Sequence, residues 1–519
     1  MKKVVRTPDY PIVKTKQGKL HGYQEDDVFH FLGIRYGRAN RFELPTPEPE
    51  WSGVRDAKAY GHICPILPEK PQPEDSPMAA PGNSFEMPHV YWPMSENCLY
   101  LNVWTKHLDE NAKKPVMVWL HGGGYCAGSS VEIPAYNGHN LSNFGDVVIV
   151  NLNHRLNCLG FMDLSSFGEK YKYSGCLGMA DIVLALSWVR ENIQAFGGDP
   201  DNVTVAGQSG GGGKAAALVQ MPTADGLYHK IISQSGVLCK RTQSTVSEEK
   251  KYWQKLGEKT VELLGLNADN IDDICRMPYE QISAAAVKAG EALHYPGGMM
   301  LFEPSPTEGM YIGQECMTGF REETKHIPVM AGTMLGEFSF MHYLGNKNKY
   351  SEVEKYNILE QAYGRHTMAV ISAFREIYPQ LDILYALSVD AMFRFQTKEF
   401  LMRRAAFAKG KCYNYLMTFI IPYLGGLAPW HCGDIPFVFR NVDMEPAHCT
   451  GYEYTTDLSN HVSKAWLAFM KHGNPSTKQL KWTNFTQSHP DRMIFDRECR
   501  MEIKDDSALL KLITSCERR

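Results

Sequence analysis

The chain has 519 residues, of which 44% are hydrophobic and 22% are charged, and its formal net charge is -4 at pH 7. This composition is ordinary for a soluble globular protein, and no apolar run approaches the roughly 20 residues that a membrane span needs. Because acidic and basic residues are interspersed, no basic field attracts nucleic acid or an anionic lipid surface, and a small, roughly neutral substrate is expected.

The amino-terminal stretch and the cysteines bear on the compartment. Residues 1–20 carry basic side chains, but no apolar stretch of about 7 to 15 residues follows them, which argues against a secretory signal. The 13 cysteines are scattered without CxxC pairs, a pattern typical of reduced thiols and not of a disulfide framework or a zinc site. We therefore expect a cytoplasmic protein without a cysteine-bound zinc ion.

Short β-rich runs alternate with helical segments along the chain. A helix is expected at 178–196, where apolar residues recur at helical spacing before Gly197 and Gly198 end it. Strand, helix and strand in this order predict a doubly wound, mostly parallel α/β sheet. The expected strands cover residues 115–120, 146–153, 202–207, 230–236, 327–333 and 412–419.

Two long stretches, about 243–325 and 347–408, are helical and charged and contain no comparable β-run. We expect them to be insertions that cap the active site. The proline- and acid-rich segment 67–88 is expected to form one long surface loop. Because no repeat, low-complexity tract or long linker divides the chain, residues 1–519 are expected to form a single domain.

Four consecutive glycines, Gly210 to Gly213, follow a strand and a serine in VTVAGQSGGGGKAA (203–216). Each glycine weakens a helix by up to about 1 kcal/mol relative to alanine, so another requirement must place them there. A phosphate-binding P-loop fails on spacing, because its lysine is needed at position 213 and no hydroxyl residue follows Lys214. The stretch fits G-x-S-x-G, which presents Ser209 on a nucleophile elbow, although the motif alone also allows a plain glycine-rich turn.

A second glycine run supports the elbow. The HGGG sequence at 121–124 follows the expected strand 115–120 and is of the kind found in the oxyanion loops of lipases and esterases. Acyl transfer needs amide donors aimed at the developing oxyanion, and each donor removed costs about 2.7 to 4 kcal/mol of barrier. The two motifs together, each directly after a strand, favour a hydrolase site over two unrelated turns.

In this arrangement the acid and the histidine follow the serine along the chain. Glu337 stands directly after the expected strand 327–333, whereas nearby glutamates lie in a solvated charge cluster. His431 lies on a Gly- and Pro-rich loop after the expected strand 412–419, whereas two later histidines lie in a helical stretch. Glu337 and His431 are therefore the best candidates for the acid and the general base.

Long motifs along the whole chain resemble the type-B carboxylesterases, the family that includes cholinesterases, bacterial carboxylesterases and some lipases. The similarity runs essentially end to end and is greatest to a bacterial carboxylesterase. The motifs are FHFLGIRYGRANRFELPTPEPEWSGVRDA (29–57), SENCLYLNVW (95–104), NHRLNCLGF (153–161), FGGDPDNVTVAGQSGG (196–211) and AWLAFMKHGNP (465–475).

This resemblance implies an α/β-hydrolase fold and selects the same residues as the reasoning from motifs. It also implies ion pairs of Arg41 with Glu96 and of Arg155 with Asp181. By motif position it implies Ser209 as nucleophile, Glu337 as acid and His431 as base, with oxyanion amides from Gly123, Gly124 and Gly210.

The chain departs from the family pattern at three places. Gly210 replaces a usual alanine, Lys214 replaces a small hydroxyl residue, and the glycine that usually follows the acid is missing. Gly210 is expected to leave extra room beside the acyl carbon for bulky esters. Secreted relatives form a disulfide at the positions of Cys64 and Cys98, which we expect to be close together but reduced.

We therefore expect a serine hydrolase that cleaves carboxylic esters of small molecules through an acyl-enzyme, with a Ser-His-Glu triad and no metal or organic cofactor. An amide- or carbamate-cleaving enzyme would use the same triad and stays an alternative. A catalytically silent, cholinesterase-like binding or adhesion protein is the other alternative, although such relatives typically lack the serine that is present here as Ser209. The sequence leaves open the natural substrate, the acyl chain length, the alcohol and the oligomeric state.

Overall fold

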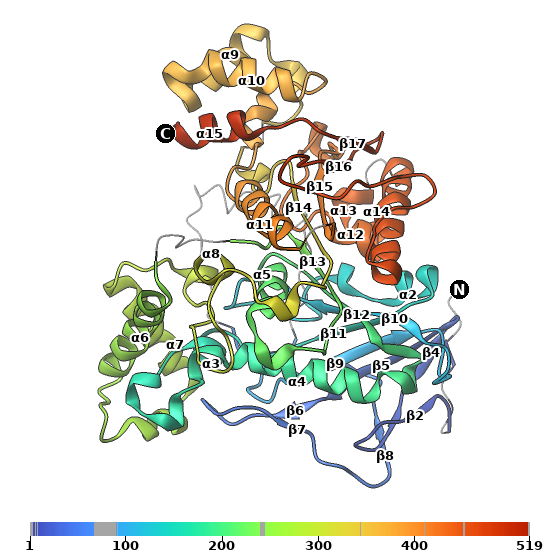
Figure 1. Cartoon of the computed structure of the whole chain (residues 1–519), viewed down its shortest axis with the longest axis vertical. Helices are drawn as coiled ribbons and strands as arrows, with labels where there is room; N and C mark the ends of the chain where they lie inside the picture. The colour runs from blue at the N-terminus through green and yellow to red at the C-terminus, as the bar shows by residue number, and fades with distance from the viewer. Residues whose placement is uncertain are drawn as a thin grey trace.

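The computed structural model describes residues 4–516 except 6, 8, 67–89, 91, 239–243, 343, 409, 450 and 451, so the loop expected at 67–88 lies outside the described residues. A 12-stranded sheet runs through the molecule (Figure 1). Its strands, in spatial order, are β1 (Val4–Val5), β4 (Tyr23–Glu25), β5 (Val28–Arg35), β9 (Tyr100–Thr105), β11 (Val148–Leu152), β10 (Lys114–Leu120), β12 (Gly198–Gln208), β13 (Lys230–Gln234), β14 (Val329–Met334), β15 (Cys412–Met417), β16 (Arg492–Phe495) and β17 (Arg500–Glu502).

The central strands confirm the doubly wound, mostly parallel sheet. From β11 through β10 and β12 to β16, every neighbouring pair is parallel. All six expected strands occur, as β10 to β15. The sequence patterns do not predict the antiparallel strands at the two edges, such as β5 beside β9 and β17 beside β16.

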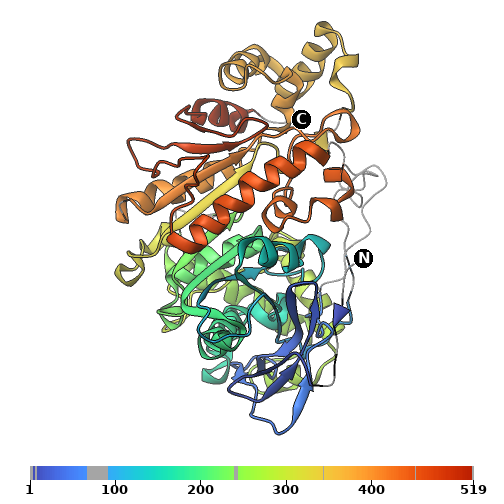
Figure 2. The ribbon, with the colours of Figure 1, turned by 90° about the vertical axis from the view of Figure 1, so that its right-hand side faces the viewer.

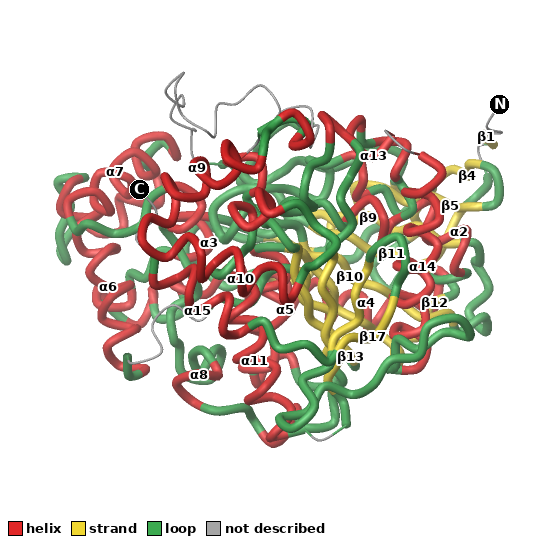
Figure 3. Tube along the Cα trace, turned by 90° about the horizontal axis from the view of Figure 1, so that it is seen from above, coloured by secondary structure: helices red, strands yellow, loops and turns green. Residues whose placement is uncertain are grey.

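Alternating side chains of the central strands pack into two separate cores. In β10, Val116 and Val118 join the cluster that contains α4 (Leu177–Asn192), the helix expected from residue 178. Met117 and Trp119 point to the opposite face and join the cluster that contains α14 (Tyr452–His472). Figure 2 shows α14 lying along one face of the sheet, and Figure 3 shows helices on both sides of the strands. Burial of each large apolar side chain contributes about 1.5 to 3 kcal/mol, so these two cores fix the sheet.

The two stretches expected as insertions are helical. The first contains α6 (Val246–Leu263) and α7 (Tyr279–Ala292), which pack against each other. The second contains α9 (Glu352–Tyr363) and α10 (Thr367–Ile377), which share a third core with the carboxyl-terminal α15 (Ser507–Ser515) at the top of Figure 1.

One helix of the second stretch does not belong to an insertion. The helix α11 (Phe393–Phe407) packs directly on β14 and β15 and buries Phe400 and Leu401 in the core of the sheet. The expectation that 347–408 is an insertion throughout is therefore wrong for α11. Charged residues such as the exposed Glu399 alternate in this helix with the apolar residues that cover the strands, so its sequence shows no distinct apolar pattern.

Both ion pairs that the resemblance implies are present. The Arg41 guanidinium donates to the Glu96 carboxylate, with an Nε to Oε2 distance of 2.6 Å. Arg155 donates to Asp181 at 2.7 Å from Nη2 to Oδ1, and both of these side chains are buried. Arg155 lies in the loop after β11 and Asp181 lies near the start of α4, so the second pair connects these two segments.

The cysteines match the sequence prediction only in part. Cys64 and Cys98 are buried and free, and a hydrogen bond between them, together with burial, raises the pKa of the Cys98 thiol well above its ordinary value. Cys316 is disulfide-bonded, so the expectation that all thiols are reduced is wrong. Because disulfides persist in oxidising compartments, the cysteines no longer support a cytoplasmic location. Among the residues that the structure describes, no helix is long and apolar enough to span a membrane.

Candidate functional site

The two glycine motifs lie side by side at the point where the strand order reverses. The chain leaves β10 for β11 on one side and returns to β12 on the other, and β10 and β12 are parallel neighbours with Leu120 paired to Gly207. Ligands of doubly wound sheets bind beyond the carboxyl ends of the strands at such a point. The loops that begin at His121 and Ser209 therefore emerge together at the expected place.

Ser209 stands on a sharp turn between β12 and α5 (Gly210–Ala217). Its backbone has φ 55° and ψ −128°, a conformation that costs energy for any residue other than glycine. The Ser209 N–H donates to the carbonyl oxygen of Gln234 on the neighbouring strand at 2.8 Å, which holds the turn in place. This is the geometry expected of a nucleophile elbow, with the positive end of the α5 dipole directly behind the serine.

The glycines of α5 are needed because backbone from other segments touches them. A Cβ atom on Gly210 would lie 2.1 Å from the carbonyl oxygen of Gly124, and one on Gly211 would lie 1.9 Å from that of Leu120. Both distances are shorter than any real Cβ contact. The expectation that Gly210 leaves extra room for bulky esters is therefore wrong, because the backbone of Gly124 already fills the space.

The HGGG loop lies against the elbow. Gly123 and Gly124 have φ values of +83° and +61°, which other residues adopt only at a cost. A Cβ atom on Gly122 would lie 3.5 Å from the Ser209 Cβ, so the loop and the serine are in contact distance. The loop that carries Gly123 and Gly124 thus lies against Ser209 and Gly210, and the amides of Gly123, Gly124 and Gly210 are expected to form the oxyanion hole.

Glu337 is fully buried just beyond β14. Its Oε1 accepts hydrogen bonds from the Ser235 hydroxyl at 2.7 Å and from the Met334 N–H at 2.8 Å. Its Oε2 lies 2.7 Å from Nδ1 of His431. These three partners fix the carboxylate, and the structure thereby joins the predicted acid to the predicted base.

Sequence reasoning missed two groups of residues around this pair. Ser235 follows β13 directly and has φ 46°. Its position at the carboxyl end of a central strand is the sequence signal that could have identified it as a site residue. The rings of Phe338 and Phe393 lie 5.6 and 5.0 Å from the imidazole of His431, measured between ring centroids. Phe338 stands where the resemblance to type-B carboxylesterases implies a glycine, and its ring forms an aromatic wall beside the imidazole together with Phe393.

The serine and the His-Glu pair are tied together by neighbours in the chain. The Cys432 thiol donates to Oε1 of Gln208 at 2.9 Å, so the residue after His431 contacts the residue before Ser209. Ser235 adds a second connection, since β12 and β13 pair up to Gln208 and the Ser235 hydroxyl holds Glu337. All three predicted triad residues are thus gathered around the ends of adjacent strands.

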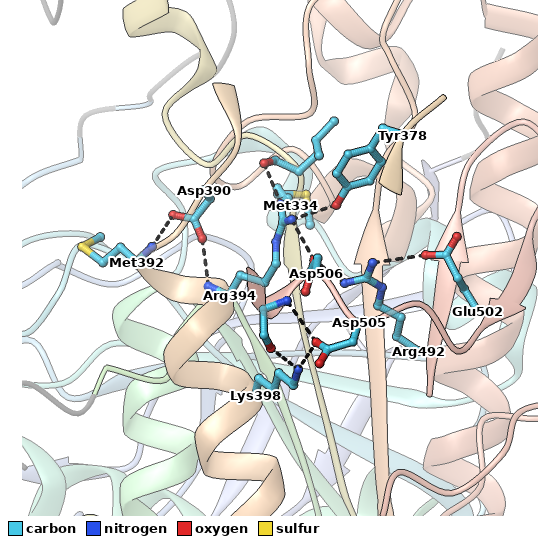
Figure 4. A network of polar contacts seen from close by, with 12 residues as sticks. Met334, Tyr378, Asp390, Met392, Arg394, Lys398, Arg492, Glu502, Asp505 and Asp506 are labelled. Atoms are coloured by element: carbon cyan, nitrogen blue, oxygen red, sulfur yellow. Dashed lines mark hydrogen bonds and ion pairs between the residues drawn. The ribbon is translucent and has the colours of Figure 1, made fainter. Parts of the chain in front are cut away.

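A buried ionic network supports the turn that carries Glu337 (Figure 4). The Arg394 guanidinium donates to the carbonyl oxygens of Leu335, at 2.8 Å, and Met334, at 3.3 Å. It also donates to Asp506 at 3.1 Å, and Asp506 accepts a further hydrogen bond from Arg492. Although burial acts to raise the pKa of Asp506, the charges of Arg492 and Arg394 bring it below its ordinary value. The carboxyl-terminal segment is therefore connected to the acid turn.

The arrangement has the parts that acyl transfer uses: an elbow serine, a histidine oriented by a carboxylate, and a glycine loop with amides beside the serine. Within the described ranges, no group of three or more His, Cys, Asp or Glu side chains is placed to hold a metal ion.

Comparisons with known proteins agree with this chemistry. The model of the carboxylesterase family matches residues 9–509. A solved esterase from the anaerobe Clostridium hathewayi, described as able to hydrolyse aliphatic aromatic polyesters, is 40% identical with a TM-score of 0.90, and the match covers 99% of this chain and 100% of that one. The para-nitrobenzyl esterase of Bacillus subtilis (strain 168) is 32% identical over 509 residues, which are 96% of this chain and 97% of the relative. The phenmedipham hydrolase of Pseudarthrobacter oxydans is 28% identical over 520 residues, which are 94% of this chain and 95% of the relative. The chain therefore belongs to the carboxylesterase family, and it is a carboxylic ester hydrolase with the α/β-hydrolase fold.

Proposed function

We propose that this enzyme cleaves esters through an acyl-enzyme on Ser209, with His431 as general base and Glu337 as the carboxylate that orients it. The observation that carries the proposal is the 2.7 Å contact between Nδ1 of His431 and the buried Glu337 carboxylate, next to an elbow serine at the reversal point of the sheet. A histidine held in this way has one ring nitrogen fixed and the other free for proton transfer.

In the first step, the Ser209 Oγ attacks the carbonyl carbon of the ester. The hydroxyl proton passes to Nε2 of His431, because Nδ1 is engaged with Glu337. The carbonyl π electrons move to the oxygen, which becomes an oxyanion on a tetrahedral carbon. Glu337 stabilises the imidazolium that forms and keeps it aimed at the serine.

The oxyanion would accept hydrogen bonds from the amides of Gly123, Gly124 and Gly210. Because these amides belong to a loop and a helix start that already touch each other, they do not need to reorganise during the reaction. Donors fixed in this way act in the transition state, where the negative charge is greatest. The positive end of α5 favours the same charge.

The intermediate then collapses and the ester C–O bond breaks. The alcohol leaves with the proton that His431 carries, and the acyl group stays on Ser209. A water molecule next gives a proton to His431 and attacks the acyl carbon, which releases the carboxylic acid and restores the serine hydroxyl. Acylation and deacylation thus use the same two residues: His431 first takes the proton of Ser209 and gives it to the alcohol, and then takes a proton from water and returns it to Ser209.

We further propose that the favoured esters contain an aromatic group. The named activities of two relatives, on para-nitrobenzyl esters and on aliphatic aromatic polyesters, support this substrate class. The aromatic wall of Phe338 and Phe393 beside His431 also supports it, since aromatic rings pack favourably against one another.

Trapping the acyl-enzyme tests the mechanism. During turnover of p-nitrophenyl acetate, acid quenching followed by intact-mass analysis should find enzyme that is one acetyl group heavier. Ser209→Ala should lose the adduct and lower kcat by at least about 10³-fold. The amide and carbamate counterparts of p-nitrophenyl acetate serve as comparison substrates. If the enzyme turned over either of them faster than the ester, its role would not be ester cleavage.

A further inference from the structure

Lys214 is a buried cation that the proposed chemistry does not use. Its side chain is 0% exposed and lies on α5, five residues after Ser209. The ammonium donates to the carbonyl oxygen of His121 at 3.2 Å. His121 is the first residue of the loop that continues to Gly124. One hydrogen bond therefore joins the helix behind the serine to the start of the glycine loop.

Lys214 belongs to a buried cluster of titratable side chains. Two imidazoles, those of His121 and His154, stack at 5.1 Å, and burial and the charge of Lys214 hold both pKa values well below the ordinary value. Burial lowers the pKa of Lys214 to about 7, while Glu132 and Cys126 act to raise it. Burial also raises the pKa of Glu132 to about 7. The two imidazoles are therefore neutral at pH 7, and the hydrogen bond to the loop comes from Lys214.

The cluster packs against the glycine loop and the residues that follow it. A Cβ atom on Gly128 would lie 2.6 Å from Nδ1 of His121 and 2.9 Å from Oε1 of Glu132, so both side chains pack on that glycine. The side-chain nitrogen of Lys214 lies 5.7 Å from the centre of the ring of Tyr125, the residue that follows Gly124. His121, Glu132 and Lys214 therefore all contact the loop or its immediate neighbours.

Stability alone does not explain a lysine at this position. Removing an ammonium from water is costly, and a well-packed apolar side chain of similar volume is often equally or more stabilising. A small hydroxyl residue is usual here in the family that this chain resembles. The cost of the buried charge therefore suggests that the hydrogen bond to the loop has a use in the reaction.

We propose that Lys214 is a positioning residue, which holds the oxyanion loop against the nucleophile helix through the carbonyl of His121. The inference rests on the proposed function, since it assumes that the amides of Gly123 and Gly124 stabilise the oxyanion. Amide donors lower the barrier only when they are fixed before the charge develops. A loop of three glycines has unusual backbone freedom, and the bond from Lys214 removes part of it.

The test compares three variants. Lys214→Met keeps most of the volume but removes the hydrogen bond and the charge, whereas Lys214→Gln keeps a donor for the His121 carbonyl. The control is Lys230→Met, which removes another buried lysine at the first residue of β13, at the opposite end of that strand from Ser235. For each variant kcat, KM, thermal unfolding and inhibition by a trifluoromethyl ketone, whose serine adduct carries an oxyanion, are measured.

Lys214→Met should lower kcat about 10- to 100-fold with KM within about twofold, and the ketone should lose affinity by the same factor as kcat/KM, as expected for an interaction specific to the transition state. Lys214→Gln should recover most of the loss, and Lys230→Met should leave kcat unchanged. If Lys214→Met does not fold, Lys214→Gln still decides, because the proposal requires it to keep kcat within about fivefold of the wild type.

A folded Lys214→Met variant with wild-type kcat and wild-type ketone affinity would overturn the inference. A variant in which KM rises while kcat stays unchanged would overturn it as well. These outcomes differ from a failure of the proposed function. In that case the wild-type enzyme itself would form no ketone adduct on Ser209, whatever stands at position 214.

Discussion

The backbone N–H of His431 donates to the carbonyl oxygen of Glu337 at 2.6 Å, so these residues are joined through their main chains as well as through their side chains. A second main-chain bond, from Gly336 to Pro429 at 3.2 Å, connects the same two loops. The loops after β14 and β15 therefore form one unit, and the imidazole is oriented by backbone geometry that a side-chain substitution leaves in place.

Glu337→Gln tests the orienting role without changing the size of the side chain. An amide that presents its NH₂ group to Nδ1 would hold the imidazole in the wrong tautomer, so kcat should fall about 10⁴-fold while KM changes little. Ser235→Ala is the matched control, because it removes only the 2.7 Å hydrogen bond to Oε1 and should cost far less. Steady-state kinetics that place Glu337→Gln within tenfold of the wild type would rule out this role.

Gly210→Ala tests the contact between the elbow and the oxyanion loop. The added methyl would meet the Gly124 carbonyl oxygen at 2.1 Å, so the loop must move and its amides must lose their positions. We expect kcat/KM to fall about 10²- to 10³-fold, and equally for acetate esters of primary and hindered alcohols. Gly297→Ala is the control, since a Cβ atom there meets nothing within 4 Å. A selective loss for hindered esters would instead mean that Gly210 shapes the substrate pocket.

Phe338→Leu tests the aromatic wall that Phe338 and Phe393 form beside His431. The Phe338 ring stacks on the His431 imidazole at 5.6 Å and 23°. Aromatic pairs are worth about 0.5 to 1.5 kcal/mol beyond their buried area, so kcat should fall about 2- to 12-fold with the fold intact. Circular dichroism checks the fold, and an unchanged kcat in a folded variant would show that the ring does not support the base.

Asp506→Asn tests the network behind the acid turn. Removing this carboxylate leaves Arg394 and Arg492 buried without their shared partner, which should cost about 3 to 5 kcal/mol of unfolding free energy. Asp505→Asn is the control, because the Asp505 carboxylate is 58% exposed in its ion pair with Lys398 and its loss should cost less than that of the buried Asp506. Urea unfolding at pH 7 compares the two.

The same substitution carries a pH signature. The pKa of Asp506 is lowered by folding, so its stabilising contribution is present above the unfolded pKa of about 3.9 and is lost as pH falls further. The difference in unfolding free energy between wild type and Asp506→Asn should therefore be constant from about pH 5 upward and shrink below about pH 4. A difference that stays constant to pH 3 would show that the Asp506 charge is not what stabilises the network.

The sequence predicted the centre of the fold because its signals there are local. Buried parallel strands are continuous apolar runs, and the glycines at 122–124 and 210–213 mark turns where other backbone comes close. The positions of Glu337 and His431 followed from one rule, that active-site residues follow strands at their carboxyl ends.

Other features depend on tertiary contacts that no local pattern encodes. The side chains of Ser235 and Phe338 meet their partners only when β13, β14 and β15 lie side by side. The prediction of extra room beside Gly210 was wrong because the space is filled by a tertiary contact: the carbonyl oxygen there belongs to Gly124, which is distant in the sequence. The packing of α11 on β14 and β15 is also a tertiary contact, and the charged residues of the helix give no local pattern that predicts it.

The most direct test of the central claim is to identify the residue that an organophosphonate ester modifies. If Ser209 is the nucleophile, peptide mass spectrometry should find one phosphonyl group per chain, on Ser209, with activity lost in proportion to labelling and no labelling of Ser209→Ala. A label on any other residue, or full activity of the Ser209→Ala enzyme, would contradict it.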